Sequence, residues 1–307
     1  VEELFAQVEQ LEQKTVDRIQ LKKDYATSAL QNLAQANDVV KAWQDIQPHF
    51  KTFFNEKANI KKLRETILQL AVQGKLTAHW RKKRRLSGVG AEAKVEPASE
   101  LLKHIKAEKQ KLINDKKIKK EKSLPKISED EKPFALPDGW EWCRFNDVIY
   151  QIGDVDHKMP NEVKEGKPYV SPRDFKPKNN INFNNAKKIS ESDFILLSRK
   201  IQPERNDIIF PRYGTIGENR IVQTDIQFLA SYSCAVVKHL ESATIPFYNF
   251  YYSISSLVKS EIKKYINKTT QPNVGVKSIK LFLFPLAPLE EQKAIVNIVD
   301  TLMAECD

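Results

Sequence analysis

Residues 207 to 217 read DIIFPRYGTIG, an apolar β-forming run followed at once by the residues of a loop. The apolar run from Ile208 to Phe210 is typical of a buried strand. Pro211 is expected to end the strand, because proline has no backbone N–H to donate. Gly214 and Gly217 permit the backbone conformations of a tight surface loop. The stretch therefore predicts a strand that runs into an exposed loop.

This loop carries a cation, an aromatic ring and a hydroxyl group, in Arg212, Tyr213 and Thr215. Arginine donates two hydrogen bonds to guanine or to phosphate, and an aromatic ring stacks on bases or contacts phosphate. The small Gly214 would let a nucleic acid approach the backbone. An ordinary hairpin turn with an exposed arginine has the same composition, so both interpretations stay open for this stretch alone.

Similar short β-rich runs, separated by proline and glycine, extend over residues 136 to 286. They are Val148–Ile152, Pro168–Val170, Ile208–Phe210, Arg220–Val222, Cys234–Val237 and Leu281–Phe284. One helical stretch, Tyr248 to Ile266, interrupts them. This spacing predicts an α+β domain with a mostly antiparallel sheet.

The first 80 residues have a different pattern. Residues 1 to 40 contain no proline or glycine, and their apolar positions form a narrow stripe at helical spacing. A second helix is expected over 56 to 73, with Gly74 just beyond its end. The fold class expected for the chain is α+β: long helices in an antiparallel coiled coil or bundle, plus one α+β domain. We expect the helix at 1–40 to pack antiparallel on a last helix at 290–307.

Residues 81 to 135 are expected to form a basic linker that contains one amphipathic helix, Leu101 to Ile113. The segment begins with RKKRR and ends after KKIKKEK at 116 to 122. Such charged runs are usually solvated linkers, and tracking of phosphates is the alternative.

Composition favours a polyanionic partner and excludes a membrane span. Lysine and arginine number 50 against 40 acidic residues, which gives a formal net charge of +10 and a pI near 9.2. The longest apolar run, 281 to 289, is short and is broken by two prolines. Three widely spaced cysteines and no visible signal peptide favour reduced thiols and a cytoplasmic location. The absence of an initiator methionine indicates a fragment.

The two ends of the chain are alike. VDTLMAECD at 299 to 307 aligns with VEELFAQVE at 1 to 9, with identical Val, Leu and Ala and with acids at matching places. The repeat implies a larger parent in which domains and helices alternate.

Five phrases of the sequence resemble the specificity subunit of type I restriction-modification enzymes. They are LRETILQLAVQGKLT (63–77), EPASELLKHIKAEKQKLI (96–113), LPDGWEW (136–142), RYGTIG (212–217) and PLAPLEEQKAIV (285–296). In that family, target-recognition domains alternate with conserved helical regions, and each domain binds one half of a split DNA site. The resemblance implies a helical region at 1–80, one recognition domain at 136–286 and the start of a second helical region at 287–307.

The resemblance also implies partners and a non-catalytic role. The expected partners are double-stranded DNA, methyltransferase subunits and restriction subunits, with no membrane and no cofactor. No Asn-Pro-Pro-Tyr or Asp-Pro-Pro-Tyr run and no glycine-rich cofactor loop occurs in the sequence. Two alternatives stay open: a helical scaffold without sequence-specific DNA binding, and a metal-dependent nuclease built on Asp138, Glu165 and Lys167.

The candidate DNA-binding residues lie on four polar loops of the recognition domain, where arginine suits guanine and amide side chains suit adenine. They are Asp156, His157, Lys158, Arg173, Lys176, Lys178, Asn179, Asn180, Arg212, Tyr213, Gly214, Thr215, Lys268, Thr269, Thr270, Gln271 and Asn273. Four apolar residues outside the main helical stripes, Phe53, Phe54, Leu68 and Val72, are the candidate partner-binding surface, with a three-helix core as the alternative.

Overall fold

The computed structural model describes residues 1–36, 38–86, 95–157, 159–267 and 270–306. The chain divides into two compact units. Unit 1 comprises Val1–Gly90 with Asn297–Asp307, and unit 2 comprises Ala91–Val296. The linker expected at 81–135 is therefore divided, and most of it folds with the recognition domain.

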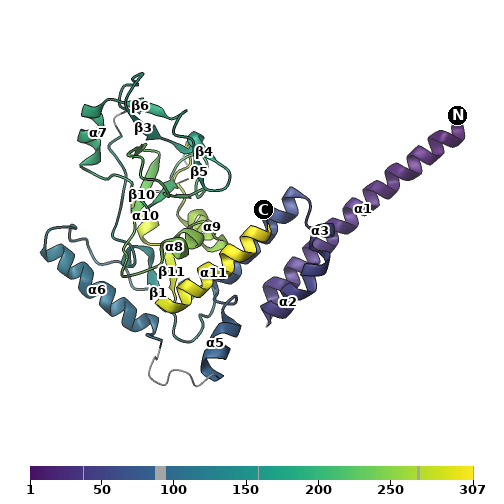
Figure 1. Cartoon of the computed structure of the whole chain (residues 1–307). Coiled ribbons are helices and arrows are strands. Elements are labelled where there is room, and N and C mark those ends of the chain that lie inside the picture. The colour runs from purple at the N-terminus through teal and green to yellow at the C-terminus, as the bar shows by residue number, and fades with distance from the viewer. Residues whose placement is uncertain (37, 87–94, 158, 268–269, 307) are drawn as a thin grey trace. The chain divides into compact units, whose positions relative to one another are not determined.

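Unit 1 is helical (Figure 1). Its elements are α1 (Glu2–Gln35), α2 (Val39–Ile46), the 3₁₀ turn η1 (Gln47–His49), α3 (Phe50–Phe53), α4 (Lys57–Val72) and α5 (Ala78–Leu86). The single helix expected over 1–40 is interrupted after Gln35. Asp38 begins α2 as its N-cap, since its carboxylate accepts a hydrogen bond from the Lys41 N–H at 3.0 Å.

The second half of α1 packs against α4. The Tyr25 ring stacks on Phe53, just before α4, at 4.0 Å between centroids. Lys75, just after α4, donates a hydrogen bond to the Ala34 carbonyl at the other end of the contact. These two contacts show that α1 and α4 run in the same direction. Gly74 has φ +67° and ends α4 as the sequence predicts.

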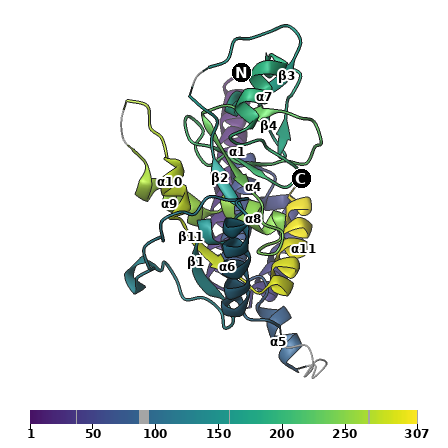
Figure 2. The ribbon, with the colours of Figure 1, turned by 90° about the vertical axis from the view of Figure 1, so that its left-hand side faces the viewer.

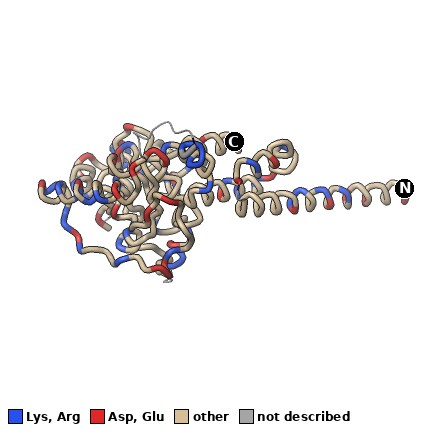
Figure 3. Tube along the Cα trace, turned by 90° about the horizontal axis from the view of Figure 1, so that it is seen from below, with Lys and Arg blue, Asp and Glu red and all other residues tan. Residues whose placement is uncertain are grey.

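The first half of α1 is exposed. Its large apolar residues are exposed over residues 1 to 21, and charged residues lie between them, acidic ones first and basic ones from Lys14 on (Figure 3). The expected antiparallel packing of a C-terminal helix along this stripe is therefore wrong for these residues. Helix α11 (Leu289–Glu305) begins in unit 2, and in unit 1 its end is held by Arg64 of α4, which donates to the Cys306 carbonyl at 3.0 Å.

Unit 2 contains a four-stranded antiparallel sheet in the order β2-β10-β7-β8. These strands are β2 (Gln151–Gly153), β10 (Cys234–Lys238), β7 (Ile208–Pro211) and β8 (Arg220–Ile221). Strand β7 continues through Pro211, which lies opposite Cys234. Proline is tolerated there because β8 pairs only with Ile208 and Ile209, so no strand needs the missing N–H on that side.

Three smaller sheets surround it. A three-stranded sheet has the order β6-β3-β9, with β3 and β9 parallel, and antiparallel pairs join β1 with β11 and β4 with β5. Their bounds are β1 (Glu141–Arg144), β3 (Lys167–Val170), β4 (Phe175–Lys176), β5 (Asn180–Ile181), β6 (Lys187–Ile189), β9 (Leu229–Ala230) and β11 (Leu283–Leu286). Among the strands of the described residues, only the pairing of β3 with β9 departs from the predicted antiparallel arrangement. Figures 1 and 2 both place β3 and β1 at opposite ends of unit 2.

Short helices cover the sheets. They are α6 (Ala98–Asn114), α7 (Glu191–Ser198), α8 (Pro246–Ser253), α9 (Ser256–Tyr265) and α10 (Val276–Lys280). The helix expected over 248–266 is two helices, because Ser255 begins α9 as its N-cap. None of the helices in the described part of the chain is long and apolar enough to cross a membrane.

The amphipathic helix α6 is fixed to the domain. Lys109 donates hydrogen bonds to the carbonyls of Asn146 (2.5 Å) and Ile149 (2.9 Å), and the Ala98 N–H bonds to the Gly139 carbonyl. Burial lowers the pKa of Lys109. The basic segment before the domain is thus anchored at both ends of α6.

Candidate nucleic-acid interface

The topology of the four-stranded sheet brings several loops to one of its ends. Because β10 is antiparallel to both β2 and β7, the residues that follow β2 and β7 and those that precede β10 lie at the same end. These are the segments at 154–157, 212–219 and 231–233. Two of them were predicted from sequence to bind DNA, and the third was not. We refer to this end of the sheet as the loop face.

The segment 270–274 joins the loop face through backbone contacts. Tyr213 forms an antiparallel bridge with Asn273, and the Val274 N–H bonds to the Arg212 carbonyl at 3.1 Å. The Asn273 side chain donates to the Gln271 carbonyl, which shapes the turn. The predicted loop at 212–215 and residues 270–273 of the predicted loop at 268–273 therefore form one surface.

The exposed side chains on this surface include Thr215, Thr270 and Gln271, while Tyr213 and Asn273 are half-buried. Gly214, at φ +70°, has nothing within 4 Å of the position where a Cβ would stand, so a ligand could approach its backbone. Lys158, Lys268 and Thr269 lie outside the described residues.

Arg212 is buried, which corrects the expectation that it contacts DNA bases. Only 5% of its side chain is exposed. Its Nη2 donates to Asp154 Oδ2 at 2.5 Å and to the Tyr232 carbonyl at 2.9 Å. Its guanidinium also lies 5.3 Å from the Tyr213 ring. An arginine engaged in this way holds the loops together and has little surface to offer a ligand.

Asp154 joins Arg212 to the next loop. The same Oδ2 lies 3.2 Å from His157 Nε2, and Lys200 approaches Oδ1 at 3.8 Å. The His157 ring, whose side chain is 60% exposed, packs on Tyr232 at 5.3 Å between centroids. Asp156 is exposed and accepts a hydrogen bond from Lys200 at 3.0 Å. His157 and Asp156 are thus placed at the surface by defined contacts.

Tyr232 is held in place by contacts with buried residues of unit 2. Its N–H donates to the hydroxyl of Tyr169 at 3.3 Å, and its ring packs against the buried cluster around Tyr169, Val170 and Cys234. Burial raises the pKa of Tyr169. Asp154 and Tyr232 were not predicted from the sequence, where their local signal is limited to an aspartate just after β2 and an aromatic residue just before β10.

The predicted loop at 171–180 is a separate hairpin that packs on β8. Asn179 both donates to and accepts from the backbone of Ile221, at 2.9 and 2.8 Å. The Lys176 carbonyl accepts a hydrogen bond from Arg220, whose guanidinium lies over the Phe175 ring. Asn179 is therefore a structural residue, which corrects its expected role in binding adenine.

The remaining predicted residues of the hairpin are on its surface. Arg173, Lys176, Lys178 and Asn180 are exposed, and Arg173 also contacts the Ser171 hydroxyl at 3.2 Å. Lys178 and Asn179 adopt φ of +58° and +57°, which makes the turn tight. The hairpin supplies cations beside the sheet, suited to phosphate contacts.

The metal-dependent nuclease alternative can be compared with the described residues. They contain no group of three or more His, Cys, Asp or Glu side chains that could hold a metal ion. Asp138 precedes β1 and Glu165 precedes β3, and these strands lie at opposite ends of unit 2 (Figures 1 and 2). Lys167 bonds to Gln227 at 2.8 Å. The residues of the nuclease alternative are therefore not brought together.

The predicted partner-binding residues are buried instead of exposed. Phe54 is 2%, Leu68 4% and Val72 2% exposed, and Phe53 is half-buried and stacks on Tyr25. These side chains fill a helical core, as the alternative interpretation held.

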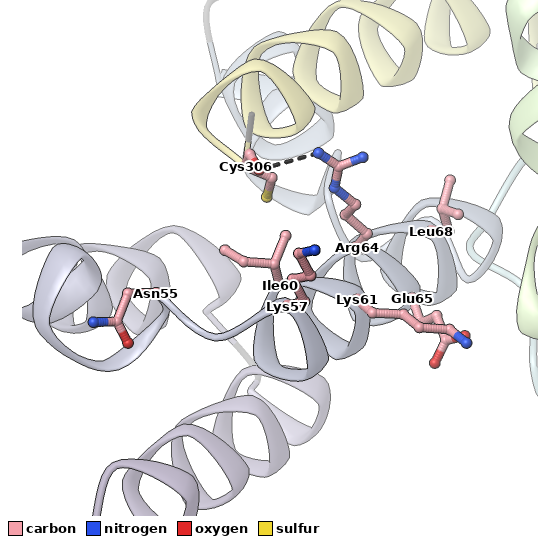
Figure 4. Close-up of a pocket in the computed structure, with 8 residues that line it drawn as sticks. All are labelled: Asn55, Lys57, Ile60, Lys61, Arg64, Glu65, Leu68 and Cys306. Atoms are coloured by element: carbon pink, nitrogen blue, oxygen red, sulfur yellow. Dashed lines mark hydrogen bonds between the residues drawn. The ribbon is translucent and has the colours of Figure 1, made fainter. Parts of the chain in front are cut away.

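A hollow of about 460 Å³ lies in unit 1 beside α4 (Figure 4). It is lined by Asn55, Lys57, Ile60, Lys61, Arg64, Glu65, Leu68 and Cys306. In Figure 4 the Arg64 guanidinium points to the Cys306 backbone, the contact described above.

Comparison with known proteins identifies the family. The model described as type I restriction modification DNA specificity domain matches residues 137–307. The EcoAI specificity subunit of Escherichia coli is 29% identical over 322 residues, which cover 99% of this chain and 51% of that subunit. The EcoEI specificity subunit of Escherichia coli is 41% identical over 144 residues, covering 46% and 22%.

Two solved structures are also similar. The HsdS subunit from Thermoanaerobacter tengcongensis is 19% identical, covers 79% of this chain and 51% of that one, and has a TM-score of 0.43. A structure described as the basis of complex assembly and conformational transition of the type I R-M system is 19% identical, covers 77% and 51%, and has a TM-score of 0.42.

This chain belongs to the family of type I restriction modification DNA specificity domains, whose model matches residues 137–307. The chain spans about half the length of the EcoAI subunit that it matches.

Proposed function

We propose that this chain recognises one half of a bipartite DNA site for a type I restriction-modification system and holds methyltransferase and restriction subunits, without catalysing a reaction itself. The observation that carries the proposal is the loop face. Three loops at one end of the sheet and a fourth bound to them place His157, Tyr213, Thr215 and Gln271 on one surface. Family membership and the net charge of +10 support DNA as the ligand.

The two sets of candidate residues have different parts in this proposal. The lysines and arginine of the hairpin at 171–180 contact phosphates and position the duplex, which gives affinity for any sequence. The polar and aromatic groups of the loop face contact base edges, which gives selectivity. One recognition unit in a chain of about half the length of its EcoAI relative supports recognition of a half-site.

The test is a selection from randomised duplexes with the full chain, alone and with a methyltransferase subunit. A short enriched sequence is expected, with binding that weakens as salt rises. Equal retention of all sequences would favour the scaffold without sequence-specific binding. Magnesium-dependent cleavage of plasmid by the purified chain would contradict the non-catalytic role.

For the partner subunit we propose the exposed half of α1, in place of the buried residues that the sequence indicated. Its exposed apolar side chains include Leu4, Phe5, Val8, Leu11 and Val16, and Val8, Leu11 and Val16 line a shallow groove with Glu12 and Thr15. Apolar residues exposed along one helix are typical of a protein-binding surface. A methyltransferase subunit is the partner that family membership favours.

A further inference from the structure

The Asp154 carboxylate contacts side chains of two different loops. It is only 16% exposed, yet it contacts a buried cation and an exposed imidazole through the same oxygen. Arg212 is the fixed member of the set, because its Nη2 also bonds to the Tyr232 carbonyl and its backbone bonds to Ser233 and Val274. His157 is the member that faces solvent. The contacts therefore run from the core to the surface through Asp154.

Because Arg212 is buried, its pairing with Asp154 is essential. A buried guanidinium is strongly destabilising without a charged partner, so Arg212 requires Asp154 to remain in place. Among the described residues, no hydrogen-bond partner contacts the Nε of Arg212, so the bond to Asp154 is one of few that fix the group. The planar guanidinium then sets the position of the carboxylate.

The carboxylate in turn sets the state of the imidazole. A carboxylate only accepts, so His157 Nε2 must carry the proton that it donates to Asp154. The Tyr232 ring limits rotation of the imidazole from one side. With Nε2 bonded to Asp154, Nδ1 is the ring nitrogen that is left to face a base edge, and in the neutral form of the ring it accepts a hydrogen bond, as the amino groups of adenine and cytosine require in the major groove.

We infer that Asp154 is a positioning residue for DNA selectivity: anchored by the buried Arg212, its carboxylate orients the exposed His157 toward a base edge. This inference rests on the proposed function, because it assigns a base-contacting residue and its support to the loop face. Arg212 contributes to selectivity through Asp154 and touches no base.

The experiment is a double-mutant cycle in the full chain. Asp154→Asn, His157→Ala and the double variant are compared by the ratio of dissociation constants for the selected duplex and for a scrambled duplex at one salt concentration. Asp225→Asn is the matched control, because it removes the carboxylate from an arginine–aspartate pair that is exposed, with Asp225 82% and Arg205 47% accessible.

Each single loop-face variant is expected to lower the selectivity ratio by about tenfold, the effect of one lost base-pair contact. The double variant should match His157→Ala alone, because Asp154 acts through His157. The control should leave the ratio unchanged. Melting temperatures are measured separately, and His157→Ala is expected to keep that of the parent chain.

Arg212→Lys provides a second route if Asp154→Asn does not fold. Lysine keeps the charge but lacks the planar group, so the ratio should again fall, and the change should vanish when His157 is alanine. An unchanged ratio for Asp154→Asn, or an effect that persists in full in the His157→Ala background, would overturn the inference and leave the proposed function intact. A parent chain that selects no sequence would overturn both.

Discussion

Arg144 and Glu131 form a two-pronged ion pair that holds the segment before the recognition domain against its first strand. Nη1 of Arg144 lies 2.9 Å from one carboxylate oxygen of Glu131, and Nη2 lies 3.0 Å from the other. The same guanidinium donates to the carbonyls of Pro125 and Leu281. Segment 125–131 is therefore part of the domain, although its composition is that of a linker.

This ion pair makes the free energy of unfolding depend on pH. The hydrogen bond from Arg144 lowers the pKa of Glu131 from 4.5 to about 2. A depressed pKa contributes stability above pH 4.5, and this contribution is lost as the pH falls toward 2. We expect Glu131→Gln to lower the free energy of unfolding by about 2–3 kcal/mol at pH 7 and by much less at pH 3.

Urea unfolding of the full chain, followed by tryptophan fluorescence at both pH values, measures this difference. Glu129→Gln is the control, because Glu129 is 89% exposed and its pair with Lys132 contributes little. Equal losses for Glu131→Gln at pH 7 and pH 3 would mean that the charge on Glu131 is not the source of the stability.

Two glycines of the loop after β7 should respond differently to alanine. Both have positive φ, +70° at Gly214 and +83° at Gly217, so each substitution strains the backbone by about 1 kcal/mol. A Cβ on Gly217 would also lie 2.7 Å from the Cδ1 of Ile262, whereas Gly214 has open space. We expect Gly217→Ala to be the more destabilising by about 1 kcal/mol.

Removing the obstructing methyl group tests this explanation. Ile262→Val lacks Cδ1, so the added loss at Gly217→Ala should shrink in that background while the loss at Gly214→Ala stays constant. Thermal unfolding of the parent chain, Ile262→Val, the two glycine variants and the two double variants gives the coupling. If Ile262→Val left the two glycine substitutions equally far apart, the contact with Ile262 would not explain their difference.

Elements with a local signal could be predicted from the sequence. The strand that begins at Ile208 and the helix that ends before Gly74 lie where they were expected. Periodicity and turn chemistry depend on residues that are close together in the sequence, so these elements have a local signal. The role of Arg212 could not be predicted, since its partner Asp154 lies 58 residues away and only the sheet brings them together.

The same contrast between local signals and long-range contacts holds for the candidate site. The loops at 212–215 and 270–273 were predicted separately, and their bridge from Tyr213 to Asn273 is a tertiary contact with no local signal. Polar side chains were expected at the surface, yet Asn179 bonds to the backbone of a neighbouring strand. Composition alone does not distinguish an amide that faces DNA from one that completes a hairpin.

Substitutions at Asn179 and Gln271 should therefore have different effects, the first on the stability of the protein and the second on DNA recognition. Asn179→Ala removes two hydrogen bonds to Ile221 and should lower the free energy of unfolding by about 1–3 kcal/mol, with no change in the preferred DNA sequence. Gln271→Ala should leave stability within about 0.5 kcal/mol and weaken binding to the selected half-site by about 1–3 kcal/mol.

Calorimetry and competition binding against duplexes changed at single positions measure the two effects. Equal weakening by Gln271→Ala on every duplex would indicate a phosphate contact in place of a base contact. A changed sequence preference for Asn179→Ala, without loss of stability, would contradict its structural role.

The last prediction concerns the two apolar surfaces of unit 1. Leu11 is 63% exposed on α1, whereas Leu68 is 4% exposed on α4. Leu11→Gln should abolish co-purification with the methyltransferase subunit and leave the melting temperature unchanged, because the substitution adds a polar group in water. Leu68→Gln should lower the free energy of unfolding by about 3 kcal/mol, because it places an amide in a packed core. Pull-down with tagged methyltransferase subunit, paired with thermal unfolding of each variant, separates the surfaces. Retention of the methyltransferase by Leu11→Gln and by a matching Val8→Gln variant would show that the exposed half of α1 is not the docking surface.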